Sequence, residues 1–208
     1  MNIRIIDNFL KNEDINEICS LKLFKKVSRD EVCVYHNAID KNNIKAECLA
    51  ANFVNRLHKN YHDVAINLLK ELNPEKVKLY DYSEFQIIET GADYKFPLHD
   101  DTPDKLLSGV IYLKPQYNTG TIFYKNRKGE GKKTIDWKIN RAVFFSRKEK
   151  KTWHSYRGDG VNNRVVLVYN LMTKKVKEVY EIENKSFFLG EIRHKLNPLL
   201  YRYFKILI

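Results

Sequence analysis

The sequence has no long apolar run and none of the common nucleotide or zinc motifs. No stretch of its 208 residues approaches the roughly 20 apolar residues of a membrane-spanning helix. The opening MNIRIIDNFLKNED becomes polar too early for a signal peptide. The whole sequence contains no P-loop, dinucleotide fingerprint, HExxH motif or paired-cysteine zinc pattern. We therefore expect a soluble, cytoplasmic protein that does not use these nucleotide or zinc sites.

Cysteine, proline and glycine are also scarce. Cys19, Cys33 and Cys48 are an odd number without CxxC spacing, which is typical of core thiols in a reducing compartment rather than of a disulfide framework. Only 5 prolines and 8 glycines accompany 43% hydrophobic and 12% aromatic residues. This composition excludes wholesale disorder and predicts a single globular domain over residues 1–208.

The positive charge is concentrated in the middle of the chain. The net charge is +11, and residues 114–151 hold 12 Lys and Arg against 3 Asp and Glu, a net charge of +9. Residues 1–113 have a net charge of −3. The middle segment should therefore attract anionic partners, whose chemical class this charge alone leaves open.

Helical and strand patterns alternate in the first 75 residues. IRIIDNFL and VCVYHNAI are typical of strands, and a short amphipathic helix is predicted after Lys11. A longer helix is predicted over residues 45–72, where leucine, phenylalanine and valine recur at helical spacing. We interpret residues 1–75 as mainly helical support, with Asn73-Pro74 ending the long helix.

Beyond this point the apolar residues alternate with a period of two. Seven β-branched and aromatic runs separated by turn residues indicate a sandwich or barrel. They are VKLYDYSEFQIIET, LLSGVIYLKP, TGTIFYKN, KKTIDWKI, RAVFFS, KTWHSYRG and NRVVLVYNL. We expect an α+β fold with a catalytic core at residues 76–173 and the helices packed on one sheet.

The C-terminal extension, residues 174–208, combines apolar and basic residues. Packing on its own domain, a homo-oligomer interface and an amphipathic membrane-surface helix are three interpretations of this pattern, of which the first is favoured. The apolar positions at helical spacing are Leu189, Ile192, Leu196, Leu199, Leu200 and Phe204.

Three residues predict a metal site. His99 and Asp101 are two positions apart in a predicted strand, so both side chains point to the same side. His154 follows 53 residues after Asp101, far enough for several strands to return it to the same place. Two imidazoles and one carboxylate on one face of an octahedron favour non-haem Fe(II).

Arg164 strengthens this prediction. It begins the strand NRVVLVYNL, where Arg164, Val166 and Val168 share one face. A guanidinium that faces the interior of a β-structure is costly unless it meets a carboxylate. A dicarboxylate that chelates the metal at one end could meet Arg164 at the other.

The ordered pattern HDD, KLLSGVIYL, GT, WHS and NRVVLVYNL, over about residues 80–172, resembles the Fe(II)- and 2-oxoglutarate-dependent dioxygenases, in particular the prolyl 4-hydroxylase-like branch. The resemblance implies a double-stranded β-helix (jelly roll) with His99, Asp101 and His154 as iron ligands. It implies Arg164, joined by Tyr112, as the partner of the distal carboxylate of 2-oxoglutarate. Fe(II), 2-oxoglutarate and dioxygen are the cofactors and co-substrates implied, with ascorbate as a candidate reductant.

The same resemblance implies hydroxylation of an unactivated C–H bond, coupled to decarboxylation of 2-oxoglutarate to succinate. The substrate is expected to be a prolyl or other amino-acid or peptidyl side chain. An anionic small molecule, a sugar, a nucleic acid and a non-catalytic jelly-roll binding module are the alternatives. Nucleic acid is disfavoured, because the repair branch of the family has a second arginine that NRVVLVYNL lacks. Phe96 stands where the family often has a tyrosine, and Thr119-Gly120-Thr121 replaces a double glycine, which leaves the substrate open.

Overall fold

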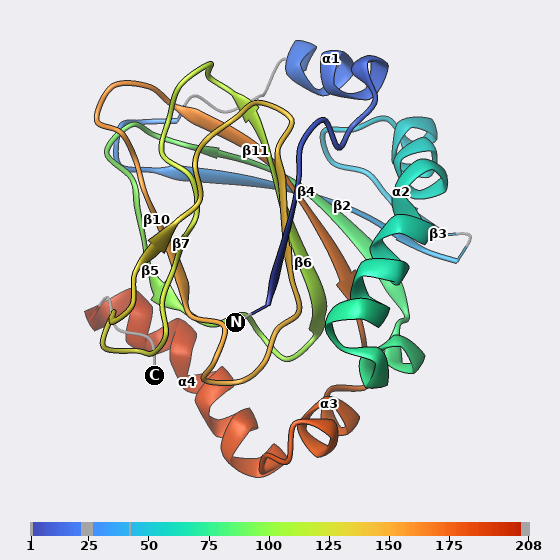
Figure 1. Cartoon of the computed structure of the whole chain (residues 1–208), viewed down its shortest axis with the longest axis vertical. Coiled ribbons are helices and arrows are strands. Elements are labelled where there is room, and N and C mark those ends of the chain that lie inside the picture. The colour runs from blue at the N-terminus through green and yellow to red at the C-terminus, as the bar shows by residue number, and fades with distance from the viewer. Residues whose placement is uncertain (1, 22–26, 42, 205–208) are drawn as a thin grey trace.

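Two antiparallel β-sheets form the centre of the protein (Figure 1), in a computed structural model that describes residues 2–21, 27–41 and 43–204. The larger sheet has seven strands in the order β1-β9-β6-β11-β4-β2-β3, and the smaller has four in the order β5-β10-β7-β8. The strands are β1 (Ile3–Ile6), β2 (Val32–Asp40), β3 (Asn43–Lys45), β4 (Tyr82–Thr90), β5 (Lys95–His99), β6 (Lys105–Lys114), β7 (Ile122–Phe123), β8 (Lys133–Thr134), β9 (Ala142–Phe145), β10 (His154–Arg157) and β11 (Arg164–Met172).

From β4 onward the chain crosses repeatedly between the two sheets. The strands β4, β6, β9 and β11 belong to the larger sheet, and β5, β7, β8 and β10 belong to the smaller one. Only the step from β7 to β8 stays within one sheet. Since every strand has inward-facing and outward-facing positions in alternation, this arrangement directs one face of each of these strands into a shared interior.

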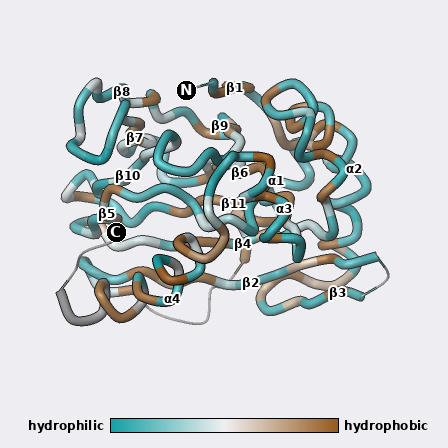
Figure 2. Tube along the Cα trace, turned by 90° about the horizontal axis from the view of Figure 1, so that it is seen from below, coloured by the Kyte–Doolittle hydropathy of each residue, from teal (hydrophilic) through white to brown (hydrophobic). Residues whose placement is uncertain are grey.

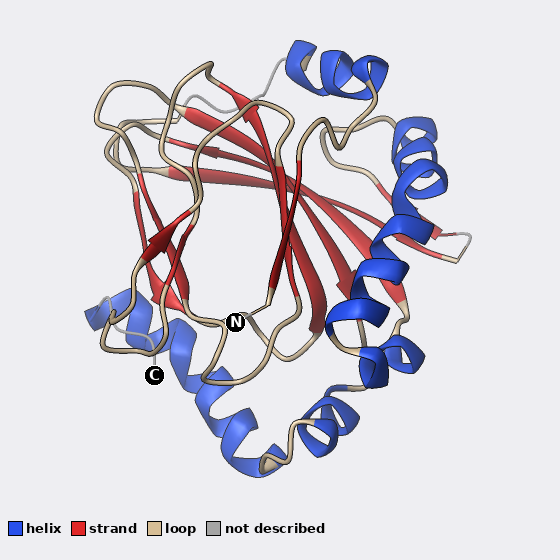
Figure 3. Ribbon diagram, in the orientation of Figure 1, coloured by secondary structure: helices blue, strands red, loops and turns tan. Residues whose placement is uncertain are grey.

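Helices cover the outer face of the larger sheet (Figure 3). The long helix α2 contacts β2, β3, β4, β6 and β9 with a face that includes Phe53, Leu57, Ala65 and Leu69, all fully buried. The predicted packing of helices on one sheet is therefore confirmed. The helices are α1 (Asn12–Ser20), α2 (Ala51–Leu72), the 3-10 helix η1 (Pro74–Leu79), α3 (Val176–Ile182) and α4 (Phe187–Phe204).

The structure corrects three local predictions. The long helix begins at Ala51 instead of residue 45, because residues 43–45 form β3 and pair with β2. The run that begins at Val77 starts in the 3-10 helix η1, and its strand begins only at Tyr82. Residues 1–75 also supply three strands, so this part of the chain completes the larger sheet as well as supporting it.

Two apolar clusters stabilise the fold. The larger lies between the helices and the seven-stranded sheet and includes Phe53, Phe85 and Leu167. The smaller lies between the two sheets, where Phe123 and Phe145 meet edge to face with ring centroids 5.2 Å apart. Because the smaller cluster fills only part of the interior, a cavity remains beside it.

The C-terminal helix α4 packs on its own domain with one side only. Gly190 lies against Tyr180 of α3, and Arg193 forms ion pairs with Asp100 and Glu149. Figure 2 shows hydrophobic and hydrophilic stretches along the same helix, and its exposed side chains include Leu189, Ile192, Leu196 and Leu199. The side chain of Phe204, which was predicted to join this face, lies outside the described side chains. Within the described ranges, no helix is both long and apolar enough to cross a membrane.

Candidate metal centre

His99, Asp101 and His154 lie together between the two sheets. One potential ligand atom of each residue lies within 4.8 Å of those of the other two. The strand pairing explains this approach, because β10 lies beside β5 with His154 directly opposite His99. Their imidazole rings are 4.2 Å apart between centroids. The tertiary structure therefore brings together the three residues that the sequence predicted as a metal site.

Both histidines are oriented by backbone carbonyls. The Nδ1 atom of His99 lies 2.9 Å from the carbonyl oxygen of Pro97, and Nδ1 of His154 lies 2.9 Å from that of Thr152. Because a carbonyl oxygen can only accept a hydrogen bond, Nδ1 of each ring is the donor, which leaves Nε2 as the nitrogen available to a metal ion. Backbone support of this kind is characteristic of metal-ligating histidines.

Two side chains of β6 hold the carboxylate of Asp101 by hydrogen bonds. Lys105 donates to Oδ1 at 2.9 Å, and Ser108 donates to Oδ2 at 2.6 Å. The strand prediction for this position was wrong in detail, because β5 ends at His99 and Asp101 lies in the following loop. Arg147 fixes that loop by donating from Nε to the carbonyl oxygen of Asp101.

The electrostatics of the three groups suit a divalent cation. Burial, together with the neighbouring His154, lowers the pKa of His99 to about 3. Burial would raise the pKa of Asp101, but Lys105 and the two imidazoles hold it well below its ordinary value. The site thus offers a neutral imidazole at His99 and an ionised carboxylate at neutral pH, which are the protonation states that metal binding requires.

Arg164 lies at the start of β11 and is 5% exposed. Its guanidinium carbon is 3.8 Å from the ring centroid of Tyr156, a cation–π contact. Within the described part of the chain, its Nε atom has no hydrogen-bond partner. Burial lowers the pKa of Arg164 from its ordinary value, and the neighbouring Tyr156 and Tyr112 offset this effect only in part.

A cavity of about 310 Å³ joins Arg164 to the candidate metal ligands. His99, Asp101 and His154 line it, and so do Arg164, Val166 and Val168, as the predicted face of β11 requires. Ser155, Tyr156 and Thr121 add polar groups to its wall. The cavity is therefore large enough for a small organic acid and has a cation at one position and a metal-ligand set at another.

The structure does not place Tyr112 in this cavity. Its hydroxyl donates to Oγ1 of Thr121 at 3.1 Å and accepts from the backbone N–H of Thr121 at 2.8 Å. Its ring stacks on Trp137 with centroids 4.6 Å apart. The Tyr112 hydroxyl is thus engaged with Thr121 and the ring belongs to the core between the sheets, 5.6 Å from the guanidinium carbon of Arg164. The contact of Tyr112 with a co-substrate carboxylate stays a prediction.

Sequence reasoning missed several residues of the site. Ser108 is four positions before Tyr112 in a strand, so period-two alternation could have placed it on the inner face. Tyr156 is two positions after His154 in β10, so the same alternation could have placed it on the inner face, although the pairing of β10 with β5 shifts register between these two residues. Lys105, by contrast, reaches Asp101 from the start of β6, and Val32 and Val34 come from β2, so only the tertiary structure could reveal them.

Comparison with solved structures relates this fold to iron oxygenases. A prolyl-4-hydroxylase of Pseudomonas putida aligns with 14% identity and a TM-score of 0.53 over 83% of this chain and 92% of that one. A 2OG-Fe(II) oxygenase family member from Burkholderia pseudomallei aligns with 15% identity and a TM-score of 0.54 over 82% and 84%. No protein-family model and no curated protein matches the sequence.

A third structure is similar in the same way. It is a prolyl hydroxylase from Trichoplax adhaerens in complex with a peptide fragment of hypoxia inducible factor, with 15% identity and a TM-score of 0.54 over 85% of this chain and 86% of that one. The chain therefore shares its fold with prolyl hydroxylases and other 2OG-Fe(II) oxygenases, as the sequence resemblance implied.

Proposed function

We propose that this protein is an Fe(II)- and 2-oxoglutarate-dependent dioxygenase. The observation that carries the proposal is the pair of histidines whose Nδ1 atoms are bonded to backbone carbonyls, beside a carboxylate held in position by two donors. The two sheets then correspond to the two halves of a double-stranded β-helix, and His99, Asp101 and His154 are the iron ligands. The shared fold supports this assignment.

Arg164 is the proposed partner of the co-substrate. A buried guanidinium whose Nε has no partner in the described chain fits the distal carboxylate of 2-oxoglutarate, since such a carboxylate would supply the missing acceptor. Tyr156 holds the guanidinium from one side through its ring, and the ring is itself fixed by a hydrogen bond from its hydroxyl to Asn118. This assignment replaces Tyr112 by Tyr156 as the aromatic residue that supports the co-substrate site.

The residues of the chain would bind and orient the metal and the co-substrate and would exclude water from the cavity. His99 and His154 would hold iron through Nε2, and Asp101 through a carboxylate oxygen that Lys105 and Ser108 keep in place. Val110, Val166 and Val168 make the cavity wall apolar and limit the access of water. When bound, Fe(II) and 2-oxoglutarate supply the oxidising chemistry, in which dioxygen provides one oxygen atom to succinate and one to a hydroxylated substrate.

A prolyl or other peptidyl side chain is the substrate that we propose. Val32 and Phe96 line the cavity and are each 39% exposed, so they mark its opening with apolar surface. Tyr94 lies beside Phe96, and Phe96 meets the ring of His99 edge to face at 4.3 Å between centroids. An apolar, aromatic opening next to the metal ligands suits a pyrrolidine ring or a short aliphatic side chain.

Anaerobic addition of Fe(II) and 2-oxoglutarate tests the proposal directly. The wild-type protein should develop the weak visible charge-transfer band of chelated 2-oxoglutarate, and Asp101→Asn should not. Asp100→Asn is the matched control, because Asp100 is paired with Arg193 of α4 and is not one of the three ligands.

Turnover gives the second measurement. Wild-type protein and Asp100→Asn should form succinate when a proline-containing peptide pool is added, with a mass gain of one oxygen atom in the stimulating peptide. A band of equal strength in Asp101→Asn, or its absence from concentrated wild-type protein, would contradict the iron assignment. A band without succinate formation from any peptide or metabolite would favour a non-catalytic binding module.

A further inference from the structure

A groove lined by five lysines lies next to the candidate metal cavity. Its volume is about 970 Å³, and its basic side chains come from the ends of β7 and β8 and from the loop between β9 and β10. They are Lys125, Lys133, Lys148, Lys150 and Lys151, here called the lysine groove. Phe123 lines the groove, and its ring lies 5.9 Å from that of His154, so the two hollows share a wall.

The charge of the lysine groove is not neutralised by the protein. In the described ranges, none of its five lysines forms an ion pair, and Glu75 is the one acidic residue among the groove-lining side chains. Other cations of the same basic segment are paired: Lys138 and Arg141 contact Asp7, and Arg147 contacts Glu183. Five lysines without an ion pair therefore line one groove, where their charge attracts an anionic partner.

The groove lies at the edges of both sheets. Asn2, Ile3 and Lys133 line it; Ile3 begins β1, Asn2 precedes that strand, and Lys133 begins β8. Among the strands that the structure describes, β1 is an edge strand of the larger sheet and β8 is an edge strand of the smaller one. An edge strand has backbone N–H and C=O groups with which the backbone of a peptide can form hydrogen bonds.

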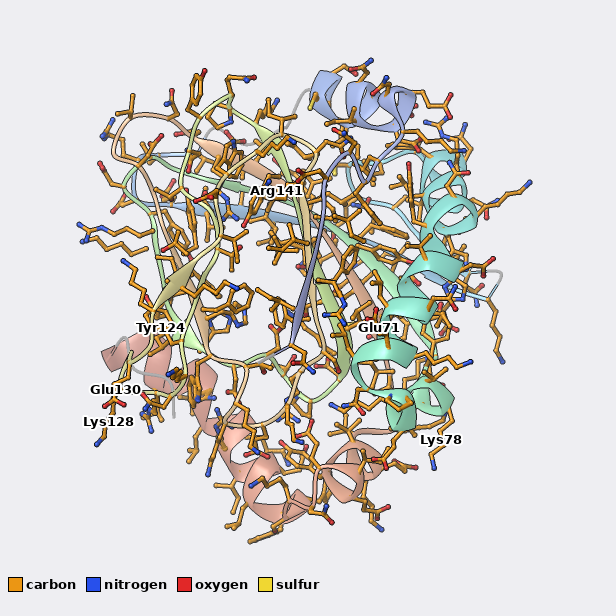
Figure 4. All side chains as sticks on the ribbon, in the orientation of Figure 1. Glu71, Lys78, Tyr124, Lys128, Glu130 and Arg141 are labelled. Carbon is orange, nitrogen blue, oxygen red and sulfur yellow. The ribbon has the colours of Figure 1, made fainter. Side chains whose placement is uncertain are left out.

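Nucleic acid fits the lysine groove less well. Single-stranded nucleic acids are usually held by basic grooves that also present aromatic faces to the bases. The aromatic residues that line this groove are Phe123, which is 2% exposed, and Tyr124, which is half-buried and bonded through its hydroxyl to Ser155. In Figure 4, Tyr124, which directly follows β7, and Glu71 of α2 lie on opposite sides of β1.

We propose that the lysine groove binds an extended, acidic segment of a partner polypeptide. Lysine ammonium groups from the β7–β8 hairpin and from the loop between β9 and β10 meet the carboxylates of the segment, and the edge strands β1 and β8 meet its backbone. This site is separate from the cavity that holds His99, Asp101 and His154, and the proposal does not depend on iron or 2-oxoglutarate.

Fluorescence anisotropy with a labelled deca-glutamate peptide, measured near physiological salt and with EDTA present, tests the proposal. The variant Lys133→Glu/Lys148→Glu reverses one charge on each of two elements of the groove. The control Lys59→Glu/Lys70→Glu makes the same change in net charge on α2, at two lysines that do not line the groove. The groove variant should bind the peptide at least about tenfold more weakly than the wild type does, a loss of about 1.4 kcal/mol in binding free energy. The control should bind it less than about threefold more weakly.

Two further probes separate the partner classes. A deca-glutamate peptide that is N-methylated at alternate residues keeps its charge but lacks half of its backbone donors, and should bind more weakly than the parent peptide. An oligothymidylate of equal charge should bind more weakly than the parent peptide too. Equal losses in the two charge variants would overturn the proposal, because net charge alone would then explain binding. Tighter binding of the oligothymidylate would assign the groove to nucleic acid instead.

Discussion

Replacement of Arg164 by methionine should stabilise the protein in the absence of 2-oxoglutarate. Arg164 is 5% exposed and its Nε has no partner in the described chain, so the folded state carries an incompletely compensated charge. Replacing buried ionic groups by apolar side chains of similar volume is often stabilising by about 1–4 kcal/mol. The lost cation–π contact with Tyr156 offsets about 0.5–2 kcal/mol of this gain.

The expected net gain is therefore about 1–2 kcal/mol in the free energy of unfolding. For a chain of this length this corresponds to an increase of about 2–8 °C in Tm. Thermal unfolding of Arg164→Met and wild type, both with EDTA and without 2-oxoglutarate, measures the difference.

The same substitution should abolish stabilisation by 2-oxoglutarate. With anaerobic Fe(II), a ligand at 100 times its Kd stabilises wild-type protein by about 2.7 kcal/mol, whereas Arg164→Met at the same concentration should gain far less. The three proposed metal ligands are unchanged in the variant, so Fe(II) alone should still raise its Tm.

Arg147→Met is the matched control, because Arg147 is also buried but is paired with Glu183 at 2.7 Å. Its loss should destabilise the protein by about 3 kcal/mol or more. A lower Tm in both arginine variants would refute the inference that the charge of Arg164 is incompletely compensated. If 2-oxoglutarate raised the Tm of Arg164→Met as much as that of the wild type, Arg164 would not be the partner of its distal carboxylate.

Two predictions concern other parts of the fold. Burial lowers the pKa of His58 and His62, whose ring centroids are 4.4 Å apart. In the unfolded chain both histidines take up protons as the pH falls below the ordinary histidine pKa of about 6.5, whereas the folded protein disfavours their protonated forms. Stability should thus fall as the pH drops below about 6.5, and His58→Leu/His62→Leu should show a shallower fall in urea midpoints; parallel pH profiles would contradict this. Gly120→Ala should cost about 1–3 kcal/mol, because a Cβ at Gly120 would lie 1.8 Å from the carbonyl oxygen of Ile135 and 3.0 Å from the Tyr112 hydroxyl oxygen; an unchanged urea midpoint would show that this strand connection can move.

Local patterns in the sequence were sufficient for the main elements and for the inner face of β11. Arg164, Val166 and Val168 all line the cavity, because side-chain alternation in a strand is a property of the local backbone. The patterns located element boundaries less well: residues 43–45 formed β3 by pairing with β2 instead of starting the long helix. That outcome depends on a hydrogen-bonding partner that the local pattern does not contain.

Tyr112 shows the same limit at the site. Its position in β6 was predicted correctly, but its hydroxyl is bonded to Thr121, a contact made by a separate segment of the chain. The ring of Tyr156 lies nearer to Arg164, at 3.8 Å against 5.6 Å for that of Tyr112, because β10 and β11 bring Tyr156 and Arg164 together in space.

The sequence by itself therefore determined the residue types of the candidate site: two histidines, one aspartate and one arginine at spacings that suit strands. Only the tertiary structure decided that β5 and β10 pair with His99 opposite His154, and that Lys105 and Ser108 hold Asp101. It also separated Lys138 and Arg141 of the basic segment, which meet the carboxylate of Asp7, from the five lysines that line the groove. The physical reason is that charge compensation and hydrogen bonding depend on distances between residues that are far apart in the chain.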